Sequence, residues 1–237
     1  MPESNPPKGF FITGTDTEVG KTYVATQIIN GLAKSGVAVS GFKPVASDAQ
    51  VLAGQLKNSD ALSLMAVASV ALPYEVVNPY CFAPAIAPHI AAQQAGVRID
   101  LATITSSYQQ HREASEVVVV EGAGGWKVPL SDKLGFDDVA LSLGLPVILV
   151  VGMKLGCINH ALLTEEAIIN KGCRVLGWVA NSYCDGFEQL SENLEALNER
   201  MRFPCVGVFS YNALPEKNTE LDQKNMSSLL ACLSEFR

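Results

Sequence analysis

The sequence predicts an α/β fold, a single domain built on a mostly parallel, twisted β-sheet with helices on both faces. Three observations point to this class. Short runs rich in valine and isoleucine recur along the 237 residues. The runs are continuous rather than alternating in hydrophobicity, which is typical of strands buried on both faces of a parallel sheet. Segments with helical spacing separate them, so strand and helix alternate along the chain.

Six apolar runs are the predicted strands. They are GFFITG (9–14), GVAVSGFKP (36–44), EVVVVEGAGG (116–125), LPVILVVG (145–152), RVLGWVAN (174–181) and PCVGVFS (204–210). Four helices are predicted over 21–36, 58–69, 159–172 and 185–201. Two of them end on a glycine, which is a common helix stop, and the helix over 58–69 offers an Asn or Ser cap at its start.

Composition limits the number of domains and the classes of partner. With 48% hydrophobic residues, the chain has enough apolar material for one well-buried domain over 1–237. Its net charge of -7 includes no basic block, so we expect no nucleic-acid partner. Residues 1–8 read as a flexible tail rather than a signal peptide, and the longest apolar run, 145–153, is far below the ~20 residues of a membrane span. We therefore expect a cytoplasmic protein without a membrane partner.

The segment GTDTEVGKT, residues 14–22, lies between the first strand and the first helix. It ends like a phosphate-binding loop, although five residues rather than the usual four precede Gly20 and Thr15 replaces the first glycine. Backbone N–H groups at a helix N-terminus favour a bound polyphosphate. We therefore expect Lys21 to reach the β- and γ-phosphates of a nucleotide and Thr22 to bind Mg²⁺.

Further polar residues follow the other strands. Glu121 ends an apolar strand, where a carboxylate commonly organises Mg²⁺, and the glycines after it allow close approach to the backbone. Lys43, after the second strand, is a candidate for steadying charge on a transferring phosphoryl group. Asp60 is either a metal carboxylate or part of a helix cap.

Five polar or glycine-rich loops thus follow five strands. They are Thr13–Thr22, Lys43–Ser47, Glu121–Gly125, Lys154–Asn159 and Asn181. In an open parallel sheet, ligands lie beyond the carboxyl ends of the strands. The sequence therefore predicts that these loops converge on one site.

The segment KLGCINHA, residues 154–161, allows two interpretations. Cys157 and His160 together suggest a nucleophile and its base, but no third group to orient them is evident. Asn159 fits better as a helix cap or a polar contact to a ligand. We favour the interpretation in which Asn159 is a helix cap or a ligand contact and Cys157 is not a nucleophile.

The motifs taken together resemble the dethiobiotin synthetase family, the ATP-dependent ring-closing enzymes of biotin synthesis. The segments that carry the resemblance are TGTDTEVGKT (13–22), GFKPVAS (41–47), NSDAL (58–62), NPY (78–80), PHI (88–90), VEGAGGW (120–126), PLSD (129–132), LPVILVVGMKLGCINHALLT (145–164) and GWVAN (177–181). The resemblance spans residues 9–181 in order and weakens afterwards. It implies a P-loop NTPase-like fold and a cyclo-ligase that uses 7,8-diaminononanoate, CO₂ and ATP with Mg²⁺. The products would be dethiobiotin, ADP and phosphate, formed through a carbamate and a carbamic-phosphoric mixed anhydride.

The resemblance also implies roles for particular residues. The catalytic residues would be Lys21, Lys43 and Lys154. The metal ligands would be Thr22, Asp60 and Glu121. Nucleotide contacts would come from Glu18, Val19, Gly20, Lys21, Thr22, Tyr23, Asp60, Glu121, Gly122, Ala123, Gly124, Asn181, Ser210 and Tyr211. Substrate contacts would come from Thr17, Lys43, Ser47, Gly156, Cys157, Ile158 and Asn159. The family is homodimeric, with the Gly156–Asn159 turn supplied by the second subunit.

Two departures and one alternative remain. Ser182 and Ser210 stand where the family often has Asp and Pro, so recognition of the base is in doubt. The alternative is a P-loop switch ATPase of the partitioning or site-placing type. Those proteins carry a signature lysine just after the first glycine of the loop, where this chain has Thr15 and Asp16.

Overall fold

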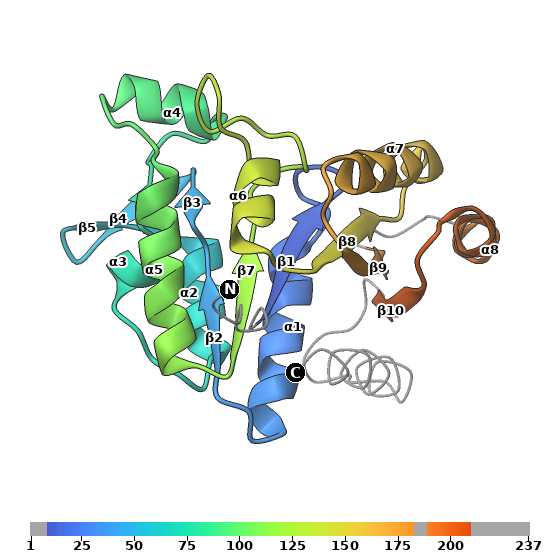
Figure 1. Cartoon of the computed structure of the whole chain (residues 1–237), viewed down its shortest axis with the longest axis horizontal. Helices are drawn as coiled ribbons and strands as arrows, with labels where there is room; N and C mark the ends of the chain where they lie inside the picture. The colour runs from blue at the N-terminus through green and yellow to red at the C-terminus, as the bar shows by residue number, and fades with distance from the viewer. Residues whose placement is uncertain (1–8, 183–188, 210–237) are drawn as a thin grey trace, which may run out of the picture.

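The structure, a computed structural model, describes residues 9–182 and 189–209. Its centre is a six-stranded sheet of order β10-β9-β8-β1-β7-β2 in which every pair of neighbours is parallel (Figure 1). The strands are β1 (Gly9–Gly14), β2 (Val39–Phe42), β7 (Val117–Glu121), β8 (Val147–Gly152), β9 (Val175–Asn181) and β10 (Cys205–Phe209). Each lies within one of the six predicted runs, so the predicted fold class is confirmed.

Helices cover both faces of the sheet. On one face, α1 (Lys21–Lys34) and α2 (Ser59–Val67) pack against Val117 and Val119 of β7. On the other, Val118 and Val120 pack in the cluster that includes α5 (Leu101–Ala114), α6 (Phe136–Leu143), α7 (Cys157–Asn170) and α8 (Leu190–Arg200). Successive strand residues point to opposite faces. Both sets are apolar because both faces are buried, which explains the continuous hydrophobic runs in the sequence.

Several elements were not among those predicted from the sequence. Besides α5 and α6, they are the short helices α3 (Tyr74–Val77) and α4 (Pro88–Gln94), the strand pair β3 (Val45–Ala46) and β6 (Tyr80–Cys81), and the hairpin β4 (Ala49–Leu52) and β5 (Gln55–Asn58). The hairpin projects from the side of the molecule next to α2 and α3 (Figure 1). Most residues of the hairpin are exposed. Its sequence therefore lacks the hydrophobic pattern that marks a buried strand.

The helix starts test two predicted caps. Asn58 caps α2, since its Oδ1 accepts hydrogen bonds from the backbone N–H groups of Asp60 (3.0 Å) and Ala61 (3.2 Å). The prediction that Asn159 caps the helix after β8 is wrong. That helix, α7, begins at Cys157 behind Gly156, whose φ of 92° is in the left-handed region that suits glycine. The predicted helix over 185–201 is observed from Leu190, and residues 185–188 lie outside the described part.

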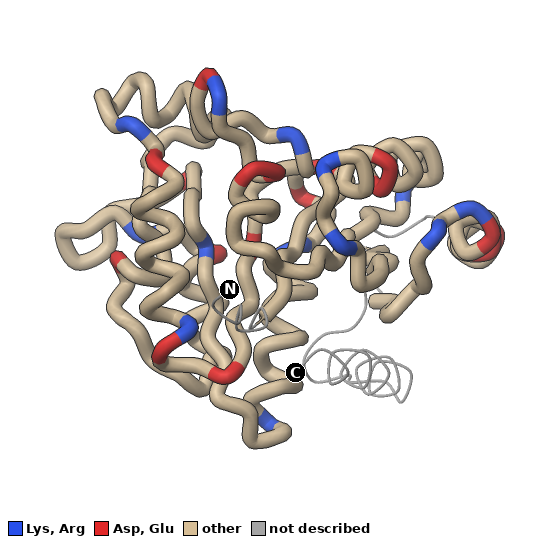
Figure 2. Tube along the Cα trace, viewed as in Figure 1, with Lys and Arg blue, Asp and Glu red and all other residues tan. Residues whose placement is uncertain are grey.

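Charged residues of both signs are interspersed along the described trace (Figure 2). Within the same residues, no helix combines the length and the apolar composition that a membrane span requires.

Candidate active site

A cavity of about 720 Å³ lies where the loops after β1, β2 and β7 meet. These strands are close neighbours in the sheet, so their carboxyl ends lie together at one edge. The predicted site residues that line the cavity are Thr17, Glu18, Gly20, Lys21, Thr22, Lys43, Ser47, Asp60, Glu121, Ala123 and Gly124. Three of the five predicted loops therefore meet in the cavity, together with the start of α2. Ala85–Ala87 and Val128 also line the cavity and were not predicted, because these apolar residues belong to no motif, whereas Pro88 lies in the PHI segment.

The loop between β1 and α1 is folded tightly around its lysine. The Lys21 ammonium is buried and donates a hydrogen bond to the Asp16 carbonyl at 2.9 Å. Gly20, directly before the helix, has a φ of 87°. A Cβ atom at Gly20 would lie 2.0 Å from Asn181 Nδ2, so both conformation and space require glycine there.

Asn181 supports this loop from the end of β9. Its Nδ2 donates to the Val19 carbonyl at 2.8 Å, and the Val19 side chain itself is in the core. Asn181 does not line the cavity, and neither does Tyr23, whose ring packs edge-on against Phe209. Ser210 and Tyr211, also predicted to contact the nucleotide, lie outside the described residues.

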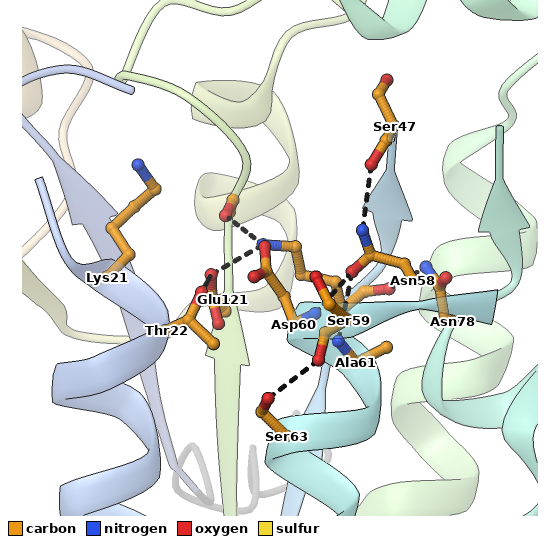
Figure 3. A network of polar contacts seen from close by, with 12 residues as sticks. Lys21, Thr22, Ser47, Asn58, Ser59, Asp60, Ala61, Ser63, Asn78 and Glu121 are labelled. Carbon is orange, nitrogen blue, oxygen red and sulfur yellow. Dashed lines mark hydrogen bonds and ion pairs between the residues drawn. The ribbon is translucent and has the colours of Figure 1, made fainter. Parts of the chain in front are cut away.

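Lys43, at the end of β2, joins the two carboxylates of the site. Its Nζ lies 2.6 Å from Glu121 Oε1 and 2.8 Å from Asp60 Oδ2. Thr22 Oγ1, on the first turn of α1, donates to the same Glu121 oxygen at 2.7 Å (Figure 3). Lys43 and Glu121 are 2% and 0% exposed, so this pair is shielded from water, whereas the Asp60 side chain is 37% exposed. Four segments far apart in sequence therefore meet at one set of polar atoms.

The two lysines respond differently to burial. Burial, followed by the nearby positive charge of Lys43, lowers the pKa of Lys21 to about 8, against the opposing effect of the nearby acids. Burial opposes the charge of Lys43 as well, but Glu121 and Asp60 outweigh it and raise the pKa of Lys43 above its ordinary value. Burial alone would raise the pKa of Asp60, but Lys43, Thr22 and Lys21 together outweigh burial and lower it. Lys43 is thus the fixed cation of the site, and Lys21 is easily neutralised until an anion binds.

The oxygen atoms around Thr22 fit a Mg²⁺ ion. Thr22 offers a hydroxyl, and Asp60 and Glu121 offer carboxylates, the hard oxygen ligands that Mg²⁺ prefers. Glu121 Oε2 is buried and has no hydrogen-bond partner among the described residues, so it has an acceptor available. The described residues contain no cluster of three or more His, Cys, Asp or Glu suited to a metal. Mg²⁺ sites of phosphoryl-transfer enzymes usually use one or two carboxylates together with phosphate oxygens.

The turn between β8 and α7 lies apart from the cavity. Lys154 Nζ pairs with Asp16 Oδ2 at 3.0 Å, which connects this turn to the phosphate-binding loop. Gly156, Ile158 and Asn159 do not line the cavity of their own chain. Leu155, between Lys154 and Gly156, is 94% exposed, so the turn presents an apolar side chain at the surface.

The side chain of Cys157, predicted to be among the substrate contacts, does not line the cavity of its own chain. That side chain is in the hydrophobic core, because α7 starts at Cys157 and turns it inward. Its Sγ donates to Asn193 Oδ1 at 3.7 Å and not to His160. The alternative of a Cys157–His160 nucleophile pair therefore has no support in the geometry.

The chain is similar in sequence to curated proteins of one name. The ATP-dependent dethiobiotin synthetase BioD of Pseudomonas aeruginosa (strain UCBPP-PA14) is 48% identical over 199 residues, which cover 84% of this chain and 87% of the relative. The protein of the same name from Aromatoleum aromaticum (strain DSM 19018 / LMG 30748 / EbN1) is 46% identical over 207 residues, covering 87% and 92%. The chain belongs to the ATP-dependent dethiobiotin synthetase family. The resemblance predicted from the motifs is confirmed.

Wider comparisons show the fold of this dethiobiotin synthetase family member. A family model described as an AAA domain matches residues 8–219. The MinC:MinD cell division protein complex of Aquifex aeolicus aligns with a TM-score of 0.62 and 14% identity, over 96% of each chain. A ParA family ATPase from Chlorobium tepidum TLS aligns with a TM-score of 0.53 and 13% identity. At such low identity these matches indicate a shared fold alone.

Proposed function

We propose that this chain joins 7,8-diaminononanoate and CO₂ into dethiobiotin at the expense of ATP. The observation that carries the proposal is the position of Lys43, which lines the same cavity as the phosphate-binding residues Lys21 and Thr22. A substrate carbamate next to the γ-phosphate would therefore lie between two cations. The names and the identity of the relatives support the same reaction.

The reaction needs positioning and charge neutralisation rather than an attacking side chain. One substrate amine adds to CO₂ and loses a proton, which gives a carbamate. A carbamate oxygen then attacks the γ-phosphorus of ATP, and the bond to the bridging oxygen breaks with departure of ADP. The second amine attacks the carbonyl carbon of the resulting mixed anhydride, and phosphate leaves as the ureido ring closes.

Each proposed role follows from the position of the residue. Lys21 and Lys43 stabilise the negative charge that develops on the transferring phosphoryl group. Lys154, held at the loop by Asp16, is the third cation. Thr17 and Ser47 line the cavity and contact the diamine or its carbamate.

Thr22, Asp60 and Glu121 would hold Mg²⁺, which would neutralise charge on the β- and γ-phosphates of ATP. Lys43 already bridges Asp60 and Glu121, so it holds the two carboxylates close together. Glu18, Gly122, Ala123 and Gly124 border the nucleotide. We assign the adenine contact to Asn181, with Ser210 and Tyr211 beyond the described residues.

We further propose a cytoplasmic homodimer over a single domain, residues 1–237. In one chain the Gly156–Asn159 turn does not line the cavity, although the amides at the N-terminus of α7 suit a carboxylate. A second copy would bring that turn to the cavity, where it would receive the carboxylate tail of the substrate.

The test is an assay of phosphate release with purified protein, MgATP, bicarbonate and the diamine. Phosphate release should require the diamine, and mass spectrometry should detect dethiobiotin in equal amount to the phosphate. Omission of bicarbonate is the control and should remove both products. ATP hydrolysis at the same rate without diamine would instead support a switch ATPase.

A further inference from the structure

The hydroxyl of Tyr74 connects two segments that carry site residues. Tyr74 is the first residue of α3 and does not line the cavity. Its hydroxyl accepts a hydrogen bond from the backbone N–H of Asn58 at 2.7 Å and donates one to Asn78 Oδ1 at 2.9 Å. Asn58 and Asn78 are both buried. The Tyr74 hydroxyl therefore connects two asparagines that lie 20 positions apart in the sequence, as an acceptor for one and a donor to the other.

Asn78 holds the backbone of Lys43. Its Nδ2 donates to the Lys43 carbonyl at 2.7 Å and to the Tyr80 carbonyl at 3.1 Å. The N–H of Lys43 donates to the carbonyl of Val77 at 2.9 Å. The backbone N–H and C=O of Lys43 are thus both hydrogen-bonded to the short segment that follows Tyr74.

Asn58 holds two further residues of the cavity (Figure 3). Its Oδ1 accepts from the N–H of Asp60 at 3.0 Å, and its Nδ2 donates to the Ser47 carbonyl at 2.9 Å. The side chain therefore fixes the start of α2 and the loop after β3 at the same time. Each polar atom of the two asparagine side chains has at least one partner, so neither amide can rotate without loss of a buried hydrogen bond.

We propose that Tyr74 is a positioning residue for the ligase reaction, acting through Asn58 and Asn78 to fix Asp60 and Lys43 at their 2.8 Å separation before substrate binds. This inference rests on the proposed function, in which Lys43 must face the transferring phosphoryl group. Displacement of a catalytic group by about 1 Å can cost on the order of 10²-fold in rate. A network that connects Lys43, Ser47 and Asp60 therefore acts on the rate, although Tyr74 itself does not line the cavity.

The test replaces Tyr74 by phenylalanine, which keeps the ring and removes the hydroxyl. We expect kcat to fall about 10-fold, because Lys43 and Asp60 lose their common support, and the KM for ATP to change less than about 2-fold, because the phosphate-binding loop is untouched. Tyr80→Phe is the matched control. It removes a hydroxyl that accepts from the backbone N–H of Asp100 at 2.9 Å, on the other side of the strand pair, and should keep the wild-type kcat.

A double-mutant cycle separates positioning from general loss of stability. Because Tyr74 and Asn78 share one hydrogen bond of the network, the loss of kcat in the variant with Tyr74→Phe and Asn78→Ala should be smaller than the product of the two single losses. Three results would each overturn the inference. They are a kcat loss in the double variant equal to the product of the two single losses, a wild-type kcat in Tyr74→Phe, and a kcat loss in Tyr80→Phe as large as that in Tyr74→Phe. If Tyr74→Phe does not fold, Asn58→Asp is the second variant. Aspartate still caps α2 but cannot donate to Ser47, so kcat should again fall at constant KM for ATP, and an unchanged kcat would contradict the network.

The wild-type protein in the same assay keeps the two hypotheses apart. Diamine-dependent phosphate release by the wild type tests the proposed function. The ratio of variant to wild-type kcat tests the role of Tyr74. Failure of the proposed function and failure of the role of Tyr74 therefore give different results.

Discussion

The Lys43 ammonium lies 2.6 Å from Glu121 Oε1, although 78 positions of sequence separate the two residues. Both side chains are buried, and neighbouring strands β2 and β7 bring them together. Removing one partner of a buried pair leaves an uncompensated charge, which typically costs about 3–5 kcal/mol. The pair therefore ties the stability of this edge of the sheet to the chemistry of the site.

Lys43→Gln should reduce turnover by on the order of 10²-fold or more, because it removes a cation that faces the developing charge. The measurement is the kcat for diamine-dependent phosphate release, with circular dichroism to confirm folding. Lys127→Gln is the control for loss of a positive charge. Lys127 is paired with Asp137 but its side chain is 64% exposed, so its replacement should leave kcat unchanged. Turnover of Lys43→Gln within 2-fold of wild type would contradict the role given to Lys43.

Nucleotide binding should take up protons near pH 8. The pKa of Lys21 is lowered to about 8 in the nucleotide-free protein, so part of the population is neutral there. A bound polyphosphate favours the charged form and raises that pKa, so affinity should fall as the pH rises above about 8, by up to roughly tenfold per unit.

Isothermal titration calorimetry checks this prediction at pH 8 in two buffers of different ionisation enthalpy. The difference between the apparent enthalpies gives the number of protons taken up by the protein. Lys21→Met is the control and should remove the uptake. Release of protons, or an uptake that the variant retains, would show that Lys21 is not the responsible group.

Two inactive variants should complement each other if the site spans a dimer. Lys43→Gln and Asn159→Ala change different parts of the proposed shared site. Unfolding and refolding an equimolar mixture yields heterodimers in which one of the two sites is intact, so about a quarter of wild-type activity should return. Each variant refolded alone is the control. An active monomer in sedimentation velocity, or no recovery on mixing, would remove Asn159 from the site.

Stability should decrease on mild acidification because of His111. Its ring is fully buried against Ser40 (Nδ1 to Oγ, 2.8 Å), and burial lowers its pKa from 6.5 to about 4. The unfolded chain therefore binds a proton between these values that the folded protein does not. The contribution is fully present above pH 6.5 and is lost as the pH falls towards 4, by about 3 kcal/mol in total.

Urea denaturation at several values between pH 4.5 and 7.5 measures this effect. His111→Gln cannot titrate, so its free energy of unfolding should depend less steeply on pH than that of the wild type. Parallel pH profiles for the two proteins would show that His111 is not the source of the acid sensitivity.

The sequence predicted features whose cause is local. Strands buried on both faces need unbroken valine and isoleucine, so the six runs marked the sheet. Lys21 and Thr22 directly follow the glycine before α1, the ending typical of a phosphate-binding loop, and Asn58 caps α2 through neighbouring amides. The start of α7 was misplaced because a left-handed glycine, Gly156, can end the preceding loop without a polar cap.

The sequence by itself determined the layered α/β fold, the phosphate-binding loop and the family, because periodicity and short motifs are properties of neighbouring residues. Only the tertiary structure decided that Lys43 bridges Asp60 and Glu121, that Cys157 faces the core and that Tyr74 connects the supports of the site. These contacts join segments brought together by strand order and packing, and spacing along the chain does not record which side chains meet in space.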